Sequence, residues 1–350
     1  MTAEMQQLVQ FHALQGASLR VNKHGAVLYE QSFGSYDANT RIPIASASKW
    51  VAALVIARLV EDGQMTWEDR VGDVFPTAGP DKANITLGQL MSHTSSLSNV
   101  EDACLSNAVM TTLAVCADRI LQQPLLGAPG TAFAYGGNSM QVAGRMAEVA
   151  TGKAWDDLFI DEVALPLNLT ATDWGFKSTA PGYVRRPNPR IAGGVRSTLG
   201  DYGKLVDMVL ARGVPNGQQF LPPAAIAEMA RDRTAGTVDL FRPLNATGFG
   251  YGIGQWIEKL RNTRYPMVSS PGAFGFYPWV DQLSGIAGVF MVQEVLQVLI
   301  DDIEDVRALV NIAAAPAPPP CANRAPRVQC ATAVRPSSSP RKLDASHRGQ

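Results

Sequence analysis

The chain has 350 residues, 46% of them hydrophobic and 17% charged, so it can bury a large core in one or two domains. Its formal net charge of -1 leaves no basic excess that would favour nucleic acid or an anionic membrane as the main partner. No run approaches the roughly 18 uncharged apolar residues that span a bilayer. We therefore expect a globular protein that acts on a small molecule, with no nucleic acid partner and no membrane span.

The predicted elements begin with a short helix in the first dozen residues and a hairpin. The hairpin is ASLRVNKHGAVLYEQSFG, two strands around a turn at Lys23-His24-Gly25. From Ser46 to about Arg233 helical patterns dominate, several opened by Ser or Thr and closed by Gly. Strand character returns in GYGIGQWIEKL, GAFGFYPWVD and GIAGVFMVQEV. A last helix is indicated by apolar residues spaced three and four apart, namely Leu296, Leu299, Ile303, Val306 and Val310.

Strands at both ends of the chain, with helices between them, predict an α+β fold. One antiparallel sheet is assembled from the N- and C-terminal segments and flanked by helices, and a helical lobe of about residues 46–233 is inserted between them. The junction of sheet and lobe is the expected cleft. This domain spans residues 1–312. Residues 313–350 are rich in Pro, Ala, Ser and Arg and are expected to form a disordered tail, solvated or touching anionic surfaces.

The start of the chain and its cysteines bear on the compartment. MTAEMQQLVQFHALQG lacks the features of a secretory signal, so the chain as written is expected to be cytoplasmic, with the compartment otherwise open. The four cysteines fall into two pairs, Cys104 with Cys116 and Cys321 with Cys330, without the CxxC spacing of zinc or redox sites. We expect no metal. Cys104 and Cys116 either form a disulfide or remain buried thiols.

The stretch PIASASKW places Lys49 three residues after Ser46, where the apolar run WVAALVIARLV begins. On a helix, residues i and i+3 share a face, so Ser46 and Lys49 can meet, whereas Ser48 and Lys49 point apart. The first turn of a helix offers unpaired N–H groups to a developing oxyanion. A lysine buried among apolar side chains loses proton affinity and can take a proton from serine. The alternative is that Ser46 or Ser48 only caps the helix while Lys49 lies along its surface.

Five segments, taken in order, resemble one family. They are RIPIASASKWVAALVIARLVEDGQMTWEDRVGDVFP, ITLGQLMSHTSSL, FAYGGNSMQVAGRMAEVATGKAW, LPLNLTATDW and GGVRSTLGDYGKLVDMVLARG. Their order is similar to that in the serine β-lactamase-related family of class C β-lactamases, D-alanyl-D-alanine peptidases and family VIII carboxylesterases. The resemblance covers roughly residues 17–295 and implies a β-lactamase-like fold that needs no cofactor. Ser46 and Lys49 match the family's S-x-x-K motif, and members are often periplasmic or secreted.

The resemblance implies a second motif, Y-x-N, whose tyrosine shares proton transfer with the lysine. Tyr135 in FAYGGN stands at the tyrosine position, and a core aromatic is the alternative. Gly137 stands at the third position and Asn138 follows one residue late, so the asparagine that would hold a substrate amide is displaced or absent. Asn138 remains a candidate for substrate binding.

The third motif of the family is best matched by Ser270-Pro271-Gly272, followed by Ala273. Gly272 would let the backbone approach the substrate, and the amides of Ala273 and Ser46 would form an oxyanion hole. A plain turn after proline is the alternative. Ser270 replaces the cation that holds a substrate carboxylate in β-lactam and peptidoglycan enzymes, although another arginine, such as Arg264, could reach the cleft.

Two further residues are candidates for the site. Trp256 in GQWIEKL either lines the cleft as a substrate-binding residue or belongs to the core. A conventional Ser-His-Asp triad would need a histidine, and His93 in LMSHTSSL is the realistic candidate. The family resemblance instead places His93 in a structural helix-to-loop segment.

The sequence therefore predicts a serine hydrolase that acts by acyl transfer, with an acyl-enzyme on Ser46. We favour an esterase for small uncharged acyl esters, with Lys49 and Tyr135 deprotonating the serine and the Ser46 and Ala273 amides holding the oxyanion. Alternatives in the same family are a β-lactamase, a peptidase or amidase for D-amino-acid substrates, and a transesterase. A catalytically silent binding protein that keeps the cleft is the alternative from another class. Acyl group, alcohol and oligomeric state stay open.

Overall fold

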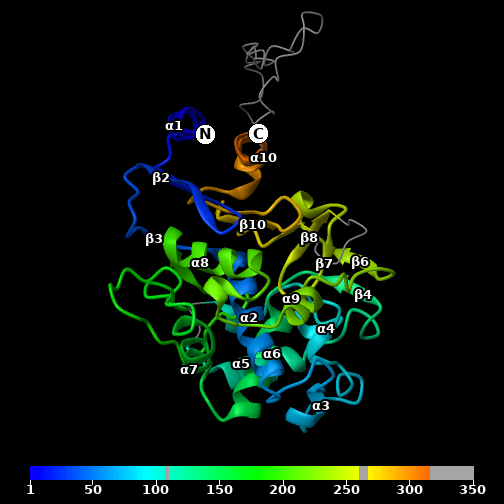
Figure 1. Cartoon of the computed structure of the whole chain (residues 1–350). Coiled ribbons are helices and arrows are strands. Elements are labelled where there is room, and N and C mark those ends of the chain that lie inside the picture. Colours follow the sequence, from blue (N-terminus) through cyan, green and yellow to red (C-terminus); the bar gives the residue numbers. More distant parts are fainter. Residues whose placement is uncertain (107–109, 260–266, 316–350) are drawn as a thin grey trace, which may run out of the picture. The chain divides into compact units, whose positions relative to one another are not determined.

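A seven-stranded antiparallel sheet is built from both ends of the chain (Figure 1). Its strand order is β2-β1-β11-β10-β9-β8-β7, and β1 lies beside β11 with Ala17 opposite Val292. This arrangement confirms the predicted α+β fold, in which one antiparallel sheet is assembled from the N- and C-terminal segments. The strands are β1 (Gly16–Lys23), β2 (Ala26–Gly34), β7 (Gly250–Tyr251), β8 (Trp256–Lys259), β9 (Met267–Ser269), β10 (Tyr277–Asp281) and β11 (Ile286–Val292).

The structure is a computed structural model, and it describes residues 1–106, 110–259 and 267–315. Arg264 and most of the predicted tail, with Cys321 and Cys330, lie outside these ranges.

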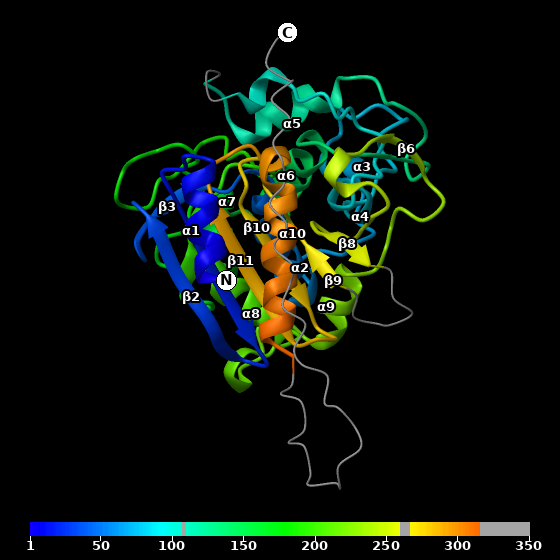
Figure 2. The same ribbon diagram turned by 90° about the horizontal axis from the view of Figure 1, so that it is seen from above.

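Helices α1 (Thr2–Phe11) and α10 (Leu296–Ala313) lie side by side across one face of the sheet (Figure 2). The predicted apolar stripe of α10 is buried there together with Leu8 of α1. One buried ion pair also ties α10 to the sheet: Arg307 Nη2 lies 2.6 Å from Glu258 Oε2 on β8. Both side chains are less than 10% exposed, so removing one partner would leave a buried charge.

Strand β11 is buried on both faces, which explains why GIAGVFMV is apolar without alternation. Ile286, Phe290 and Val292 pack in the cluster formed with α1 and α10. Val289 and Met291 belong to the cluster on the other face, which includes residues of α8 (Leu199–Leu210). The sheet is therefore a middle layer between two helical layers.

The helical lobe surrounds α2 (Ser48–Glu61), in which every residue from Ser48 to Ala57 is buried. A helix that is apolar on all sides suits such a central position. The other helices of the lobe are α3 (Val71–Val74), α4 (Leu87–Met91), α5 (Leu113–Leu121), α6 (Asn138–Thr151), α7 (Trp155–Phe159) and α9 (Pro223–Met229). Short helical turns are η1 (Ala45–Ala47), η2 (Ala103–Leu105), η3 (Ile160–Ala164), η4 (Pro215–Gly217) and η5 (Leu244–Ala246).

Some local structure differs from the sequence prediction. The sequence pattern set no start for helix α5, which begins at Leu113 because the Thr112 side chain accepts a hydrogen bond from the Val115 amide and caps the helix. Two small sheets were not predicted, since strands of three or four residues carry too little periodicity. They pair β3 (Arg41–Pro43) with β5 (Arg196–Thr198) and β4 (Ala132–Ala134) with β6 (Val238–Phe241).

Cys104 and Cys116 form a disulfide that joins η2 to α5, with their Cα atoms 5.4 Å apart. This decides between the two alternatives that the sequence left open. Among the helices of the described ranges, none has the length and apolar character needed to cross a membrane.

Candidate active site

Ser46 lies in the turn η1, which leads directly into α2. The Nζ atom of Lys49 is 3.2 Å from Ser46 Oγ, and it also donates a hydrogen bond of 3.0 Å to the carbonyl oxygen of Ala192. The structure thus brings together the serine and lysine that the i, i+3 spacing paired. Lys49 is buried, so the alternative in which it lies along the helix surface is wrong.

The backbone just before Ser46 adopts a strained conformation. Ala45 has φ of 46°, in the left-handed region that disfavours residues with a Cβ atom. Ser48 holds this turn, because its Oγ donates to the Ala45 carbonyl at 2.6 Å and accepts from the Val195 amide at 3.0 Å. The hydroxyl of Ser48 is therefore used within the fold, whereas that of Ser46 faces a cavity.

Burial shapes the proton affinity of Lys49. It lowers the pKa of the Lys49 amine from 10.5 to about 7, an effect that the carboxylate of Glu101 opposes and the guanidinium of Arg190 supports. The ammonium nitrogen also lies 4.5 Å from the centre of the Tyr135 ring. At neutral pH a large fraction of this lysine is therefore uncharged and able to accept a proton.

Tyr135 follows β4 and is held by its amide, which donates to the carbonyl of Phe241 at 3.0 Å. Burial raises the pKa of the Tyr135 phenol well above its ordinary value, although hydrogen bonding with Ser46 and Trp256 works in the opposite direction. The phenol therefore stays protonated at neutral pH. It can pass on a proton that it receives but is not a phenolate base.

His93 lies behind Tyr135, with 4.8 Å between the ring centres, and does not line the cavity that holds Ser46. Its Nδ1 is 3.0 Å from Ser139 Oγ, and its Nε2 has no hydrogen-bond partner among the described residues. Burial, with a contribution from Lys49, lowers the pKa of His93 well below 6.5. His93 is thus a neutral, buried support for the tyrosine rather than a triad base.

A cavity of about 280 Å³ lies beside Ser46 and is lined by several of the site residues predicted from the sequence. Five of them line it: Ser46, Lys49, Tyr135, Trp256 and Ala273. Its other walls come from Asn99, Glu101, Gly136, Phe241, Pro243, Asn245, Pro271 and Leu296. The side chain of Trp256 is almost fully buried, so it is both a core residue and a wall of the cavity.

The segment Ser270-Pro271-Gly272 follows β9 and packs against the turn before Ser46. A Cβ atom at position 272 would lie 2.1 Å from the Ile44 carbonyl oxygen, so glycine is needed there for close backbone approach. Among the described residues, the amides of Ser46 and Ala273 donate to no backbone carbonyl, and both residues line the cavity. Ser270 is buried, and its Oγ lies 3.4 Å from the carbonyl oxygens of Ser46 and Gly254.

Asn138 lies outside the cavity lining and is fully buried at the start of α6. Its Oδ1 accepts from the Asp102 amide at 3.0 Å, and its Nδ2 donates to the carbonyls of Ser98 and Val100 at 2.9 Å each. All of its side-chain groups are thus used to hold a loop. The expectation of a substrate-binding asparagine is corrected here to that of a loop-holding one.

Sequence reasoning missed Glu101, which this loop brings to the cavity, and its partner Arg190. Arg190 Nη2 lies 2.5 Å from Glu101 Oε2. No motif marks either residue, and they come from distant segments of the chain. Only the fold shows that they belong near Lys49.

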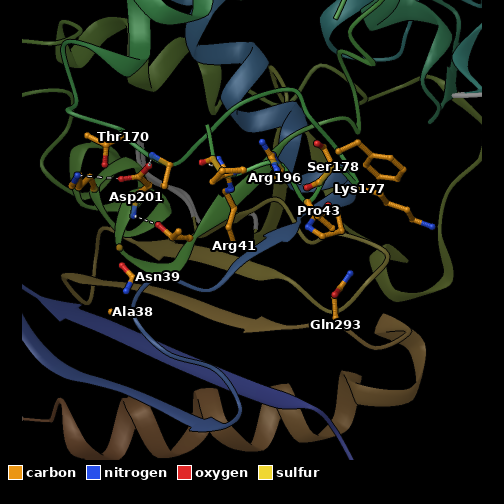
Figure 3. Close-up of a pocket in the computed structure, with 17 residues that line it drawn as sticks. Ala38, Asn39, Arg41, Pro43, Thr170, Lys177, Ser178, Arg196, Asp201 and Gln293 are labelled. Carbon is orange, nitrogen blue, oxygen red and sulfur yellow. Dashed lines mark hydrogen bonds and ion pairs between the residues drawn. The ribbon is translucent and has the colours of Figure 1, made fainter. Parts of the chain in front are cut away.

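A second, larger cavity of about 870 Å³ lies elsewhere, and Figure 3 shows it lined by Arg41 and Arg196 among others. Its arginines are engaged in holding neighbouring chain segments. Arg196 binds Asp173 at 2.7 and 2.9 Å and donates to the carbonyls of Ser178, Ala180 and Gly182. Among the described residues that line this cavity, no serine or threonine hydroxyl is hydrogen-bonded to a lysine or histidine side chain.

A serine hydroxyl beside a buried lysine of lowered pKa, in a cavity between an antiparallel sheet and a helical lobe, defines an S-x-x-K serine hydrolase. The chain belongs to the beta-lactamase family, whose family model, described as Beta-lactamase, matches residues 1–308. This confirms the family and the enzyme class predicted from the sequence.

Individual relatives agree with this assignment. The chain is 30% identical over 281 residues to Penicillin-binding protein 4 of Amycolatopsis lactamdurans, covering 69% of this chain and 71% of that protein. It is 28% identical over 207 residues to Esterase EstB of Burkholderia gladioli, covering 51% of each. A crystal structure of a "putative beta-lactamase" from Bacteroides dorei matches with a TM-score of 0.74 and 31% identity, covering 85% of this chain and 95% of that one.

Proposed function

We propose that this serine hydrolase is an esterase for small acyl esters that carry no carboxylate, acting through an acyl-enzyme on Ser46. The observation that carries the proposal is the 3.2 Å contact between Ser46 Oγ and a lysine amine whose pKa falls to about 7. A neutral amine at that distance is a general base for the hydroxyl.

In the proposed reaction, Lys49 takes the proton from Ser46 as Oγ attacks the ester carbonyl carbon. The carbonyl oxygen becomes an oxyanion, which the amides of Ser46 and Ala273 stabilise. The proton on Lys49 then moves to the leaving alkoxide through the phenol of Tyr135, and the alcohol departs. In the second half a water molecule gives a proton to the same lysine as it attacks the acyl carbon. The bond between the acyl carbon and Ser46 Oγ then breaks, the proton on Lys49 returns to Oγ, and the acid leaves.

The preference for esters over β-lactams rests on the charges around the cavity. Among the described residues that line it, only Lys49 and Glu101 can carry a charge. Ser270 supplies no cation, so a substrate carboxylate meets the carboxylate of Glu101 and no permanently charged cation in this lining. One charge-assisted hydrogen bond contributes about 1.5–3 kcal/mol, so its loss lowers kcat/KM for such substrates roughly ten- to a hundredfold.

The similarity to Esterase EstB supports the ester proposal, whereas the similarity to Penicillin-binding protein 4 supports the β-lactam or peptidase alternative. The decisive measurement is kcat/KM for nitrocefin against that for p-nitrophenyl acetate on one preparation. We expect the ester to be the better substrate, and a preference for nitrocefin would overturn the proposal.

The nucleophile is tested by labelling with a fluorophosphonate probe and mapping the labelled peptide. Wild-type protein should carry the label on Ser46, and Ser46→Ala should lose both labelling and ester hydrolysis while remaining folded. A label that moves to Ser48 or Ser95 would show that another serine is the nucleophile. A folded protein without label or hydrolysis would favour the silent binding protein.

A further inference from the structure

The loop of residues 98–102 packs against Gly136 and Gly137, which have no side chains and so leave room for it. A Cβ atom at Gly136 would lie 2.9 Å from the Cα of Asn99, and one at Gly137 would lie 2.7 Å from Glu101 Oε1. The two glycines therefore admit the loop, and the carboxylate of Glu101 stands where a side chain at position 137 would begin. Asn138, displaced by one residue, holds the loop in this place through the three hydrogen bonds described above.

Glu101 lines the cavity, and Arg190 engages only one of its two carboxylate oxygens. Its Oε2 is paired with Arg190, while Oε1 accepts no hydrogen bond from a described residue. Arg190 belongs to the lining of a neighbouring cavity and not of this one. Both side chains of the pair are more than 30% exposed, and such exposed pairs contribute little energy, so the carboxylate remains available to a ligand.

The electrostatic setting of the cavity favours a cation. Tyr135 is protonated, and Lys49 is increasingly neutral above pH 7, which leaves Glu101 as the persistent formal charge among the described lining residues. Three aromatic side chains, Tyr135, Phe241 and Trp256, are among its other walls, and aromatic faces attract ammonium groups.

We propose that Glu101 is a specificity-determining residue, whose carboxylate selects acyl groups that bear a free ammonium group over acyl groups whose nitrogen is acylated. The inference rests on the proposed function, because it concerns the acyl part of the same substrate. A carboxamide at position 137 could donate a hydrogen bond to an amide carbonyl of the substrate. A carboxylate only accepts, so it binds an ammonium and repels that carbonyl oxygen.

The test compares three ethyl esters at pH 7, where an α-ammonium group remains largely protonated. They are alanine ethyl ester, N-acetylalanine ethyl ester and ethyl propionate. Titration of the released acid measures the rate of hydrolysis. Wild-type protein should prefer alanine ethyl ester to ethyl propionate and hydrolyse the N-acetyl ester most slowly. In Glu101→Gln the ratio of kcat/KM for alanine ethyl ester to that for ethyl propionate should fall roughly ten- to a hundredfold.

A ratio is measured because Glu101 also acts on Lys49, and any effect on the base is common to all three esters. The matched control is Glu304→Gln, which removes the same charge from α10 on the other side of the sheet and should leave the ratio unchanged. Asn138→Ala, which releases the loop, should lower the ratio in the same direction as Glu101→Gln.

Two results would overturn the inference while leaving the esterase intact: hydrolysis of ethyl propionate without a preference for alanine ethyl ester, or an unchanged ratio in Glu101→Gln. If no ester is hydrolysed and Ser46 takes no fluorophosphonate, the proposed function fails and this inference fails with it.

Discussion

Replacing Lys49 by methionine should stabilise the protein at neutral pH while abolishing ester hydrolysis. The folded state holds the lysine at a pKa of about 7 against 10.5 for an ordinary lysine. Each pKa unit corresponds to about 1.4 kcal/mol, so the buried amine destabilises the fold on the order of 4 kcal/mol at pH 7. Methionine has a similar shape and no charge to desolvate.

Part of this gain is lost, because the variant leaves the Ala192 carbonyl without its hydrogen-bond donor. An unsatisfied buried carbonyl costs about 1–3 kcal/mol, so the net stabilisation of Lys49→Met at pH 7 should be about 1–3 kcal/mol. Chemical denaturation of both proteins, followed by tryptophan fluorescence, measures this difference.

The pH dependence separates the effect of the charge from that of packing. Between pH 7 and 10.5 the unfolded chain carries a proton on Lys49 that the folded protein lacks, so wild-type stability rises with pH in this window. The advantage of Lys49→Met should therefore shrink by about 1.4 kcal/mol per pH unit from about pH 7.5 to 10. A difference that does not change with pH would mean that the lysine titrates normally in the fold, and the base mechanism would be refuted.

Three further substitutions test other parts of the site. Tyr135→Phe keeps the ring but removes the proton relay, so kcat for p-nitrophenyl butyrate should fall about a hundredfold with little change in KM. His93→Ala should lower the free energy of unfolding by about 2–4 kcal/mol through the cavity that it leaves, and a folded variant without any activity would restore the triad hypothesis. Gly272→Ala should reduce kcat at least tenfold because its Cβ collides with the Ile44 carbonyl, whereas Gly200→Ala, which meets no atom within 4 Å, should leave activity unchanged.

The pair of Ser46 and Lys49 was predictable because a spacing of three residues brings both side chains onto one face where η1 continues into α2. Ala273 and Tyr135 needed the family resemblance, since nothing in their own neighbourhood relates them to Ser46. Neither residue spacing nor the family resemblance could predict the position of Glu101. It enters the cavity because Asn138 holds its loop and because two glycines leave room for it, and such contacts are not encoded in any local pattern.

The displaced asparagine shows the limit of motif reading. Placed one residue later than the family pattern, Asn138 starts α6 and turns its side chain toward the loop instead of the cavity. A shift of one residue on a helix rotates the side chain by about 100°, so the same residue type takes part in a different contact. The glycine of the third motif was easier to predict, because the close approach of the backbone at Gly272 leaves no room for a side chain.

The pairing of β1 with β11 joins the two ends of the described domain, so this sheet can be completed only late in the synthesis of the chain. At about 5–20 residues per second, the chain between Ala17 and Val292 takes roughly 15–55 s to leave the ribosome, and β1 lacks its partner on that side throughout. The Ala273 amide also arrives late in this interval, long after Ser46 and Lys49. In the proposed mechanism, a growing chain therefore carries the nucleophile without a completed oxyanion hole, and acylating compounds should spare it until the last strands join the sheet.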